Sequence, residues 1–494
     1  MSSVVRIERA SYRYPQNSYG LAPTTLAIRP GEPVFVTGPS GCGKSTLARC
    51  ITGLIPHLYR GSLAGAVWLG DLRTSETPLW RLTERSGLVF QNPAAQMLAV
   101  SVEEEVVFGL ENLGLRPPVV RERLDSTLAR LGLDGFRDRS PQTLSGGEQQ
   151  KLALAAIIAR QPSVLVLDEP LSMLDTTSAC ELVGDLVDMS RSGTAVVICE
   201  HRAEYVRDIP HLRTVRLDES VLREGRGGSG GEPQFPGPPI PDFPATSVPD
   251  FRLEVLDLGV RLGGRSVLRD LSFSAAGGQV LAVVGRNGVG KTTLLRALAG
   301  LQKHSGTVRV DGERPDLGIV FQNADLQLFN GTVRDEILYR LPDRDVARYG
   351  WLLGALGLDR YEDVAPLLLS EGEKKRVALA TVLMRGPRHG LLLDEPALGQ
   401  DAGHKARLIH LARALAAAGH LVIMTTHDLE LAAGADRLLL LGREGFVADG
   451  SPAQVLRDDA AWRAVGLLVP AWVSAAGPAS RGVCAAGAGR ERGG

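Results

Sequence analysis

Two glycine-rich segments constrain the fold more than any other part of the chain. They read GPSGCGKST at 38–46 and GRNGVGKTT at 285–293, and both match the pattern G-x-x-x-x-G-K-[ST]. Each follows an apolar run typical of a strand and precedes a run with helical spacing. Glycines let successive backbone N–H groups converge on phosphate oxygens, and a helix N-terminus favours anions. The sequence therefore predicts two phosphate-binding loops, each within a strand–loop–helix unit.

Each loop carries side chains suited to a nucleoside triphosphate and its Mg²⁺ ion. We expect Lys44 and Lys291 to reach the β- and γ-phosphates, and Ser45 and Thr292 to offer a hydroxyl to Mg²⁺. The ATP-binding residues expected in the loops are Gly38, Ser40, Gly41, Gly43, Lys44, Ser45 and Thr46 in the first, and Gly285, Asn287, Gly288, Gly290, Lys291, Thr292 and Thr293 in the second.

The rest of the chain repeats in the same order after each loop. Glu169 and His201 are separated by 32 positions, as are Glu395 and His427. Strands that alternate with helical patterns predict a largely parallel α/β sheet in each half. The repeated segments are GLVFQN and GIVFQN, TLSGGEQQK and LLLSEGEKKR, VLVLDEP and GLLLDEP, and VVICEH and VIMTTH.

One interval differs between the halves. From Lys44 to Gln91 there are 47 positions, whereas from Lys291 to Gln322 there are 31. The strands and helices that the two halves share cannot account for this difference. We therefore expect an additional loop or strand in the first half, between the phosphate-binding helix and the segment that contains Gln91.

Composition marks the domain boundaries. The segment 225–250 is rich in Gly and Pro and has neither helical nor strand periodicity, which favours a linker. We expect one domain at 1–224 and a second at 251–473. The segment 474–494 is poor in core-forming residues and is expected to be disordered.

Paired acids end the two VLVLDEP-like strands. Downstream of a phosphate-binding loop, Asp168 and Asp394 suit Mg²⁺ coordination, direct or through water. Glu169 and Glu395 follow them and are candidate catalytic bases that polarise the attacking water. An isolated Asp-Glu pair at a strand end would instead indicate a solvated loop. The residues expected to sense the γ-phosphate are His201 and His427.

With the segment LSGGEQQ at 144–150, the chain resembles the ATP-binding cassette (ABC) ATPases, and the resemblance covers nearly the whole chain except the linker and tail. It implies an α/β fold with two tandem P-loop NTPase domains. Each would have a RecA-like α/β core, an antiparallel β subdomain and a helical subdomain that carries this signature. The two cassettes would pack head to tail and hydrolyse ATP. Each ATP would lie between the phosphate-binding loop of one cassette and the signature of the other.

The resemblance also assigns roles to single residues. Gln91 and Gln322 match the loop that meets both Mg²⁺ and the transport partner, and Tyr14 matches the aromatic residue that stacks on adenine. Asp175 and Asp401 match the loop that links the two sites. The signature residues expected at ATP are Ser145, Gly146, Gly147, Ser370 and Gly372. The Mg²⁺ ligands implied are Ser45, Gln91, Asp168, Thr292, Gln322 and Asp394.

Two positions depart from the family pattern. The second half has Leu262 where the adenine-stacking aromatic is expected, so adenine packing there is aliphatic or supplied elsewhere. Its signature has Glu371 in place of a glycine. A carboxylate facing the phosphates would weaken the site by like-charge repulsion, and we expect this side chain to point outward. Each composite site then has one departure, and we expect the two sites to be unequal but both functional.

The segment FQNPAAQMLAVSVEEEVVFG, together with YRYP near the start, resembles the ATPases of energy-coupling-factor (ECF) and cobalt-type importers. In that family such ATPases dock on a transmembrane coupling protein, which joins a small substrate-binding membrane protein. Their substrates are vitamins, vitamin precursors, Ni²⁺ or Co²⁺. The longest apolar runs are shorter than the roughly 20 residues that cross a bilayer. We therefore expect a soluble chain, peripheral on the cytoplasmic face of the membrane and held there by its partners.

Other classes of protein fit less well. A fused ATPase of a sugar importer has a similar length, but its loop after the first glutamine differs from F-Q-N-P-x-x-Q. Soluble two-cassette proteins of translation have charged, helical linkers and basic surfaces. Here the linker is rich in Gly and Pro, and 55 basic residues balance 56 acidic ones, so no nucleic-acid partner is expected. A regulatory nucleotide-binding protein with little turnover also remains open.

Overall fold

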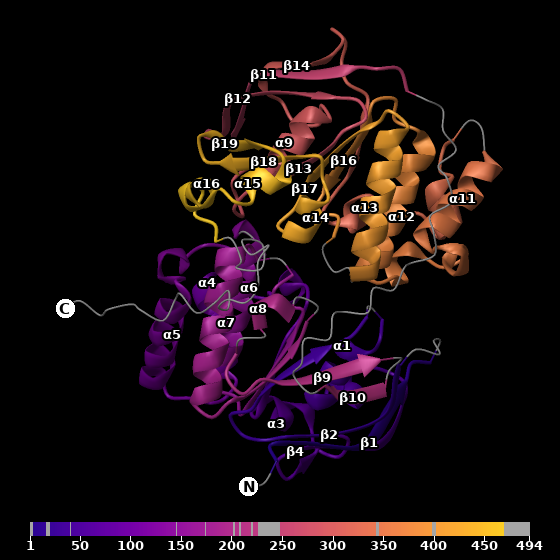
Figure 1. Ribbon diagram of the computed structural model, residues 1–494. Helices are drawn as coiled ribbons and strands as arrows, with labels where there is room; N and C mark the ends of the chain where they lie inside the picture. Colours follow the sequence, from indigo (N-terminus) through magenta and orange to yellow (C-terminus); the bar gives the residue numbers. More distant parts are fainter. Residues whose placement is uncertain are drawn as a thin grey trace. The chain divides into compact units, whose positions relative to one another are not determined.

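The computed structural model describes residues 3–15, 20–39, 41–144, 146–172, 174–200, 203–206, 209–218, 221–225, 248–341, 345–397 and 402–468. The chain divides into two compact units; described residues of the first end at 225, and those of the second begin at 248 (Figure 1). Most of the predicted linker and all of the predicted tail lie outside the described residues. Each unit has an α/β fold, as the sequence predicts.

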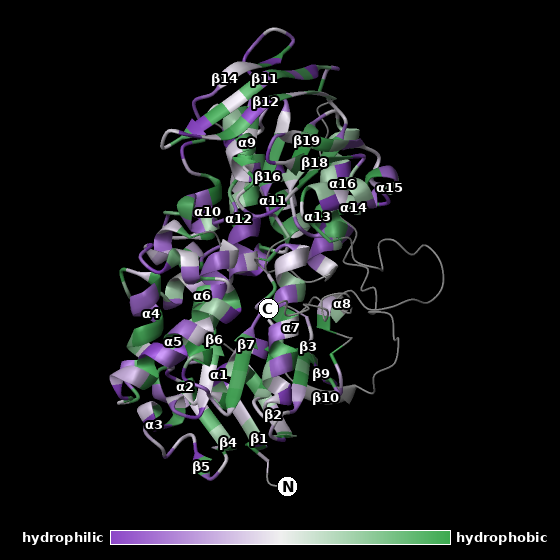
Figure 2. Cartoon of the chain, turned by 90° about the vertical axis from the view of Figure 1, so that its left-hand side faces the viewer, coloured by the Kyte–Doolittle hydropathy of each residue, from purple (hydrophilic) through white to green (hydrophobic). Residues whose placement is uncertain are grey.

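The core of the first unit is a six-stranded sheet. In spatial order its strands are β10 (Val221–Gly225), β9 (Arg213–Asp218), β3 (Pro33–Thr37), β8 (Ala195–Cys199), β7 (Val164–Asp168) and β6 (Ser86–Val89). Neighbouring strands pair in parallel, except β9 and β10, which are antiparallel. All residues of β7 and β8 are buried, as is usual for a parallel sheet covered on both faces. Figure 2 accordingly colours β7 largely as hydrophobic.

The two faces of this sheet pack into different cores because successive side chains of a strand point to opposite faces. Val164 and Val166 of β7 pack with the helix that follows the phosphate-binding loop. Leu165 and Leu167 pack with the helices of the other face, among them the signature helix. The helices of the first unit are α1 (Lys44–Ile51), α2 (Leu54–His57), α3 (Leu79–Thr83), α4 (Val102–Glu111), α5 (Pro117–Leu131), α6 (Gly146–Ile158), α7 (Thr176–Arg191) and α8 (Ala203–Val206).

A second sheet of the first unit is antiparallel. Its strands, in spatial order, are β2 (Gly20–Ile28), β1 (Val5–Arg13), β4 (Ser62–Leu69) and β5 (Leu72–Arg73). Val5 and Ile7 of β1 are buried and belong to the same core as Leu47 and Ile51 of α1. This sheet therefore covers the helix that the phosphate-binding loop begins, as expected for the antiparallel β subdomain.

The second unit repeats the topology of the first. Its main sheet has the order β15 (Leu317–Val320), β16 (Gly390–Asp394), β17 (Leu421–Thr425), β13 (Val280–Val284), β18 (Arg437–Gly442) and β19 (Gly445–Gly450), and its antiparallel sheet the order β12 (Arg265–Ala276), β11 (Arg252–Leu262) and β14 (Ser305–Val310). Its helices are α9 (Lys291–Leu298), α10 (Val333–Ile337), α11 (Val346–Leu356), α12 (Glu371–Arg385), α13 (Ala402–Ala417), α14 (Leu429–Ala433), α15 (Pro452–Val455) and α16 (Asp459–Ala464).

The additional segment predicted in the first half is present. Between α1 and β6 the first unit has α2, β4, β5 and α3, whereas between α9 and β15 the second unit has only β14. The antiparallel sheet of the first unit therefore has one strand more than that of the second. Among the described residues, no helix has both the length and the apolar composition needed to cross a bilayer.

The last helix of the described residues, α16, is fixed to the second unit by Trp462. This side chain is 1% exposed, and its indole N–H donates a hydrogen bond to the carbonyl of Val455 at 2.8 Å. Trp462→Ala is expected to destabilise the second unit by about 3–5 kcal/mol, because it leaves a cavity and an unsatisfied carbonyl. Thermal unfolding measures this, and Trp80→Ala is the matched control, since Trp80 is 67% exposed. Equal melting temperatures of Trp462→Ala and Trp80→Ala would contradict the stabilising role of Trp462.

Candidate active sites

The first phosphate-binding loop joins β3 to α1 and owes its path to glycine. Gly38 has φ +154°, and a Cβ at this position would lie 2.1 Å from the carbonyl oxygen of Leu217. Gly43 caps α1 with φ +98°. Lys44, the first residue of the helix, is buried, and its Nζ donates to the carbonyls of Gly38 at 2.9 Å and Pro39 at 3.1 Å. The ammonium group therefore lies over its own loop, where the N–H groups of the helix start converge.

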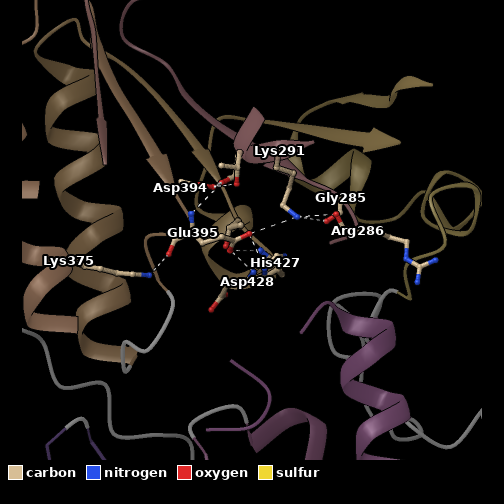
Figure 3. A network of polar contacts seen from close by, with 11 residues as sticks. Gly285, Arg286, Lys291, Lys375, Asp394, Glu395, His427 and Asp428 are labelled. Carbon is tan, nitrogen blue, oxygen red and sulfur yellow. Dashed lines mark hydrogen bonds and ion pairs between the residues drawn. The ribbon is translucent and has the colours of Figure 1, made fainter. Parts of the chain in front are cut away.

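The second loop, between β13 and α9, repeats this arrangement. Gly290 caps α9 with φ +109°. Lys291 is buried, and its Nζ donates to the carbonyls of Gly285 at 2.8 Å and Arg286 at 3.2 Å (Figure 3). A Cβ on Gly285 would lie 2.5 Å from the carbonyl oxygen of Leu441. Both loops thus have the geometry expected of phosphate cradles.

Asp168 ends β7 in the first unit and lies beside the phosphate-binding helix. It is 5% exposed, its Oδ1 has no hydrogen-bond partner, and the hydroxyl of Ser45 bonds to the carboxylate. Burial raises the pKa of Asp168 to about 6, and the neighbouring Glu169 adds to this, whereas the Ser45 bond opposes it. A buried carboxylate oxygen without a partner, next to a hydroxyl, is a donor set that fits Mg²⁺.

Asp394 holds the matching position in the second unit, at the end of β16. Its Oδ1 accepts hydrogen bonds from the hydroxyls of Thr425 at 2.7 Å and Thr292 at 3.2 Å. Burial raises the pKa of Asp394, whereas the Thr425 bond lowers it. The predicted pair of Asp394 and Thr292 is therefore together, and it too fits Mg²⁺ through oxygen donors.

Glu169, the candidate base of the first unit, contacts Gln91. The Gln91 Nε2 donates to the Glu169 Oε2 at 2.7 Å, although 78 positions separate the two residues. Glu169 has φ +49°, which is uncommon for a residue with a side chain, and its N–H donates to the carbonyl of Cys199 at 2.7 Å. Residues held in sparsely populated backbone regions cluster at functional sites.

Figure 3 shows the contacts of Glu395, the candidate base of the second unit. Its backbone is also left-handed, with φ +46°. Its Oε1 lies 2.9 Å from the His427 Nε2 and 3.9 Å from the Lys291 Nζ. Gln322 forms no hydrogen bond with it among the described contacts. Burial acts to raise the pKa of Glu395, but His427, Lys291 and Lys375 outweigh it and lower the pKa, so the carboxylate is ionised.

The two signatures begin helices. In the first unit Gly146 starts α6, and Gly147 is buried. In the second unit Ser370 caps α12: its hydroxyl accepts a hydrogen bond from the N–H of Glu373, whose carboxylate accepts one from the Ser370 N–H at 2.8 Å. Glu371 lies 3.6 Å from the Nζ of Lys374, and its side chain is 40% exposed. The Glu371 carboxylate is therefore balanced by a cation of its own helix.

Tyr14 lies at the phosphate-binding helix of the first unit. Its hydroxyl is 3.3 Å from the Thr46 Oγ1 and accepts a hydrogen bond from Arg49 at 3.0 Å. Leu262, the residue at the corresponding place in the second unit, ends β11 and is 41% exposed. Asp175 caps α7 by accepting a hydrogen bond from the N–H of Ser178. Four of the predicted residues lie outside the described part of the chain: Ser40, Ser145, His201 and Asp401.

The structure shows contacts of four residues to which the sequence analysis assigned no role, although Gln96 and Glu105 lie within the patterns F-Q-N-P-x-x-Q and V-x-x-E-V-x-F-G. Glu105 and Glu336 are buried carboxylates, and each accepts two backbone hydrogen bonds from the loop that follows the predicted glutamine. Gln96 and Gln327 hold the start of the same loop through their carboxamides. All four belong to repeated pairs at matching positions, and that repetition was the available signal. The hydroxyl of Thr425 has no counterpart in the first unit, where Cys199 occupies its place in the strand pairing.

The family model described as "ABC transporter" matches residues 21–172 and 268–398, more than half of the chain. The chain belongs to the ABC transporter family. It is an ATPase with two cassettes, as its two sets of loop, acids and signature require. A solved structure, CbiO1 from Clostridium perfringens, described as part of the ABC transporter complex cbiONQ, matches 46% of this chain and 89% of its own length, with 28% identity and a TM-score of 0.41.

Curated relatives of this ABC ATPase match it over most of their length. It is 34% identical to a Bacillus subtilis (strain 168) protein with the provisional name HMP/thiamine import ATP-binding protein YkoD, over 92% of this chain and 93% of that protein. Identity is also 34% to an ABC transporter ATP-binding protein of Treponema denticola, over 83% of this chain and 89% of that protein. A further ABC transporter ATP-binding protein, SCO2324 of Streptomyces coelicolor, is 34% identical over 92% of this chain and 95% of that protein.

The contrast between Asp394 and Asp168 gives a test of the second site. Thr425→Val keeps the shape of the side chain but removes the hydrogen bond to Asp394, a contact with a charged group that contributes about 1.5–3 kcal/mol. Because that bond lowers the pKa of Asp394, its loss raises the pKa further. In a chain whose first site is disabled by Lys44→Ala, the acid limb of the ATPase pH profile is expected to move to higher pH. Thr425→Cys, the residue of the first unit, should give an intermediate profile, and an unchanged limb in Thr425→Val would contradict the account.

Proposed function

We propose that this ABC ATPase is the energy-coupling subunit of a membrane importer of the ECF type, and that it takes part in uptake of a vitamin or vitamin precursor. The observation that carries the ATPase part is the presence of both catalytic sets in one chain. Each unit has a buried lysine on a glycine loop, a buried aspartate beside a hydroxyl, and a glutamate in a left-handed backbone. Two sets in one chain are what a pair of cassettes needs.

The importer part is supported by the relatives and by sequence. The Bacillus subtilis relative is named for HMP/thiamine import. The first half also carries F-Q-N-P-x-x-Q followed by V-x-x-E-V-x-F-G, the pattern that resembles ECF ATPases. The substrate proposed first is therefore HMP or thiamine, and Ni²⁺ or Co²⁺ is the alternative within the same class.

The two cassettes are proposed to pair head to tail within one chain. Lys44 would then share an ATP with Ser370 and Gly372, and Lys291 would share one with Ser145, Gly146 and Gly147. Binding of ATP by both cassettes favours the closed arrangement by the difference in its affinity for the closed and open states. Hydrolysis removes this preference, and the cassettes reopen.

Hydrolysis would depend on a small number of side chains in each site. The lysines balance charge on the β- and γ-phosphates, and the backbone N–H groups of the loops bind their oxygens. Mg²⁺ would be held by Ser45, Gln91 and Asp168, or by Thr292, Gln322 and Asp394, and supplies further charge neutralisation. Glu169 and Glu395 orient the attacking water and accept hydrogen bonds from it, while His427 contacts Glu395 and faces the γ-phosphate.

A docking surface for the membrane partner is proposed on the loop after each of Gln91 and Gln322. In the first unit Leu98 and Val100 are exposed, although the N–H of Leu98 is fixed by Glu105. In the second unit Leu326 and Phe329 are exposed in the corresponding loop. Apolar side chains held rigidly at the surface are typical of interfaces, and a transmembrane coupling protein and a small substrate-binding protein are the proposed partners. The chain would lie peripherally on the cytoplasmic face of the membrane.

Two other functions remain as alternatives. A fused ATPase of a sugar importer would use the same catalytic residues, and differs only in substrate and membrane partners. A soluble two-cassette protein without a transport role would hydrolyse ATP in association with other cellular machinery. Neither has a specific feature of the described residues in its favour.

Loss of both candidate bases tests the ATPase assignment. Glu169→Gln with Glu395→Gln is expected to reduce ATP hydrolysis by about 10²–10⁴-fold, because a positioned general base contributes that much. ATP binding should remain, since the phosphate contacts are untouched. Each single variant should keep part of the rate. A double variant with wild-type hydrolysis would show that the bases are wrongly assigned.

Uptake tests the transport part. Cells that lack this gene and carry the double variant are expected to lose uptake of labelled HMP or thiamine, whereas the wild-type gene restores it. Ni²⁺, Co²⁺ and a sugar are measured in the same cells to separate the alternatives. Unchanged uptake of all of them would contradict the importer proposal while leaving the ATPase assignment intact.

A further inference from the structure

Lys375 is a buried cation that links the signature helix of the second unit to its candidate base. It is the fifth residue of α12 and is 4% exposed. Its Nζ donates a hydrogen bond to the main-chain carbonyl of Glu395 at 2.7 Å (Figure 3). Taking an ammonium group out of water is costly unless partners satisfy it. A lysine in this position is therefore a defined contact between α12 and the end of β16.

This contact completes a clamp on the backbone of Glu395. The Glu395 N–H donates to the carbonyl of Thr425 at 3.1 Å and to its hydroxyl at 3.2 Å. Its carbonyl receives Lys375, so both peptide groups that flank the left-handed residue are held. Strained backbone persists only where its surroundings determine it. Lys375 thus helps to fix the direction in which the Glu395 carboxylate points.

The first unit holds the matching carbonyl in another way. The carbonyl of Glu169 accepts hydrogen bonds from the Ser172 hydroxyl at 2.8 Å and from the Ser172 N–H at 3.2 Å. Gln150 stands where Lys375 stands in the signature, and its buried Nε2 has no hydrogen-bond partner. In the sequence, Leu398, which has no hydroxyl, matches Ser172. Among the described residues, the contacts of this carbonyl thus include its own loop in the first unit and the signature helix in the second.

The acids around Lys375 favour its protonated, charged form at neutral pH. Burial lowers the pKa of Lys375 to about 8, against the attraction of Glu395, Glu371 and Asp394. Lys375 lines a pocket in the second unit, and other charged or titratable side chains line the same pocket. They are Arg376 of its own helix, and His404 and Arg407 of α13.

We propose that Lys375 is a positioning residue through which the ATP site of Lys44 controls hydrolysis at the ATP site of Lys291. This rests on the proposed head-to-tail pairing, in which the second signature serves the ATP of Lys44 while Glu395 serves the ATP of Lys291. Nucleotide bound at Ser370 and Gly372 orders the N-terminal end of α12, and Lys375 transmits this to the backbone of Glu395.

The positioning role is tested in a full chain that carries Glu169→Gln, which leaves hydrolysis only at the second site. There Lys375→Gln is expected to lower kcat by about 10- to 100-fold, because small misplacements of a base have effects of that size. KM should change little, since Lys375 touches no phosphate-binding group. Lys375→Arg, which keeps a charged donor, should restore most of the rate. Lys303→Gln is the control and should leave kcat unchanged, because Lys303 is an exposed lysine of the same unit outside the signature and the phosphate-binding loop.

Several results would overturn the positioning role. An unchanged kcat in Lys375→Gln is one, and a loss of kcat that Lys375→Arg fails to restore is another. Thermal unfolding of each variant separates a loss of fold from a loss of positioning, and a rescued Lys375→Arg variant keeps the test valid if Lys375→Gln unfolds.

The proposed effect of the Lys44 site on hydrolysis at the Lys291 site is tested by a double-mutant comparison in the same chain. Adding Lys44→Ala removes nucleotide from the first site and is expected to lower kcat of the second site when Lys375 is present. With Lys375→Gln, the same addition should have no further effect. If Lys44→Ala and Lys375→Gln lowered kcat independently, so that their fold-changes multiplied, Lys375 would not connect the two sites. If Glu169→Gln with Glu395→Gln still hydrolysed ATP, the proposed function itself would fail, which is a different outcome.

Discussion

Both catalytic sites depend on parallel pairing of strands whose carboxyl ends meet at one edge of a sheet. In the first unit Cys199 of β8 pairs with Asp168 of β7 on one side and with Val36 of β3 on the other. This register places the acid beside the start of the phosphate-binding loop. In the second unit Thr425 has the same two neighbours, Asp394 and Val283. A one-residue slip would turn every side chain of the strand to the other face and separate acid from loop.

With this shared arrangement of strands, the two units hold their buried aspartates through different contacts. Asp168 has an oxygen without a hydrogen-bond partner, whereas Asp394 accepts two hydroxyl groups. Glu169 contacts Gln91, and Glu395 contacts His427; His201, which matches His427, lies outside the described residues. Duplication therefore preserved the chemistry of the site and let its supporting contacts diverge.

Features of these sites that are local in sequence could be predicted, and those that join distant segments could not. The two glycine loops, the Asp-Glu pairs and the first signature are each continuous, and the repetition of all of them gave the fold and the family. The additional strand of the first unit could be predicted from the longer interval between Lys44 and Gln91. The bonds of Thr425 to Asp394 and of Lys375 to Glu395 join different strands and helices, so only folding brings them together. A threonine or lysine at those positions has no pattern that distinguishes it from an ordinary core or surface residue.

The central proposal is that each ATP is held by the loop of one unit and the signature of the other. Nucleotide retained per chain after gel filtration tests it directly, in a chain made unable to hydrolyse ATP by Glu169→Gln and Glu395→Gln. Lys44→Ala with Ser370→Ala damages a single site in this account, so one ATP should remain. Lys44→Ala with Ser145→Ala damages both sites, so none should remain. The reverse result, with ATP retained only in the second pair, would show that each unit binds its nucleotide alone.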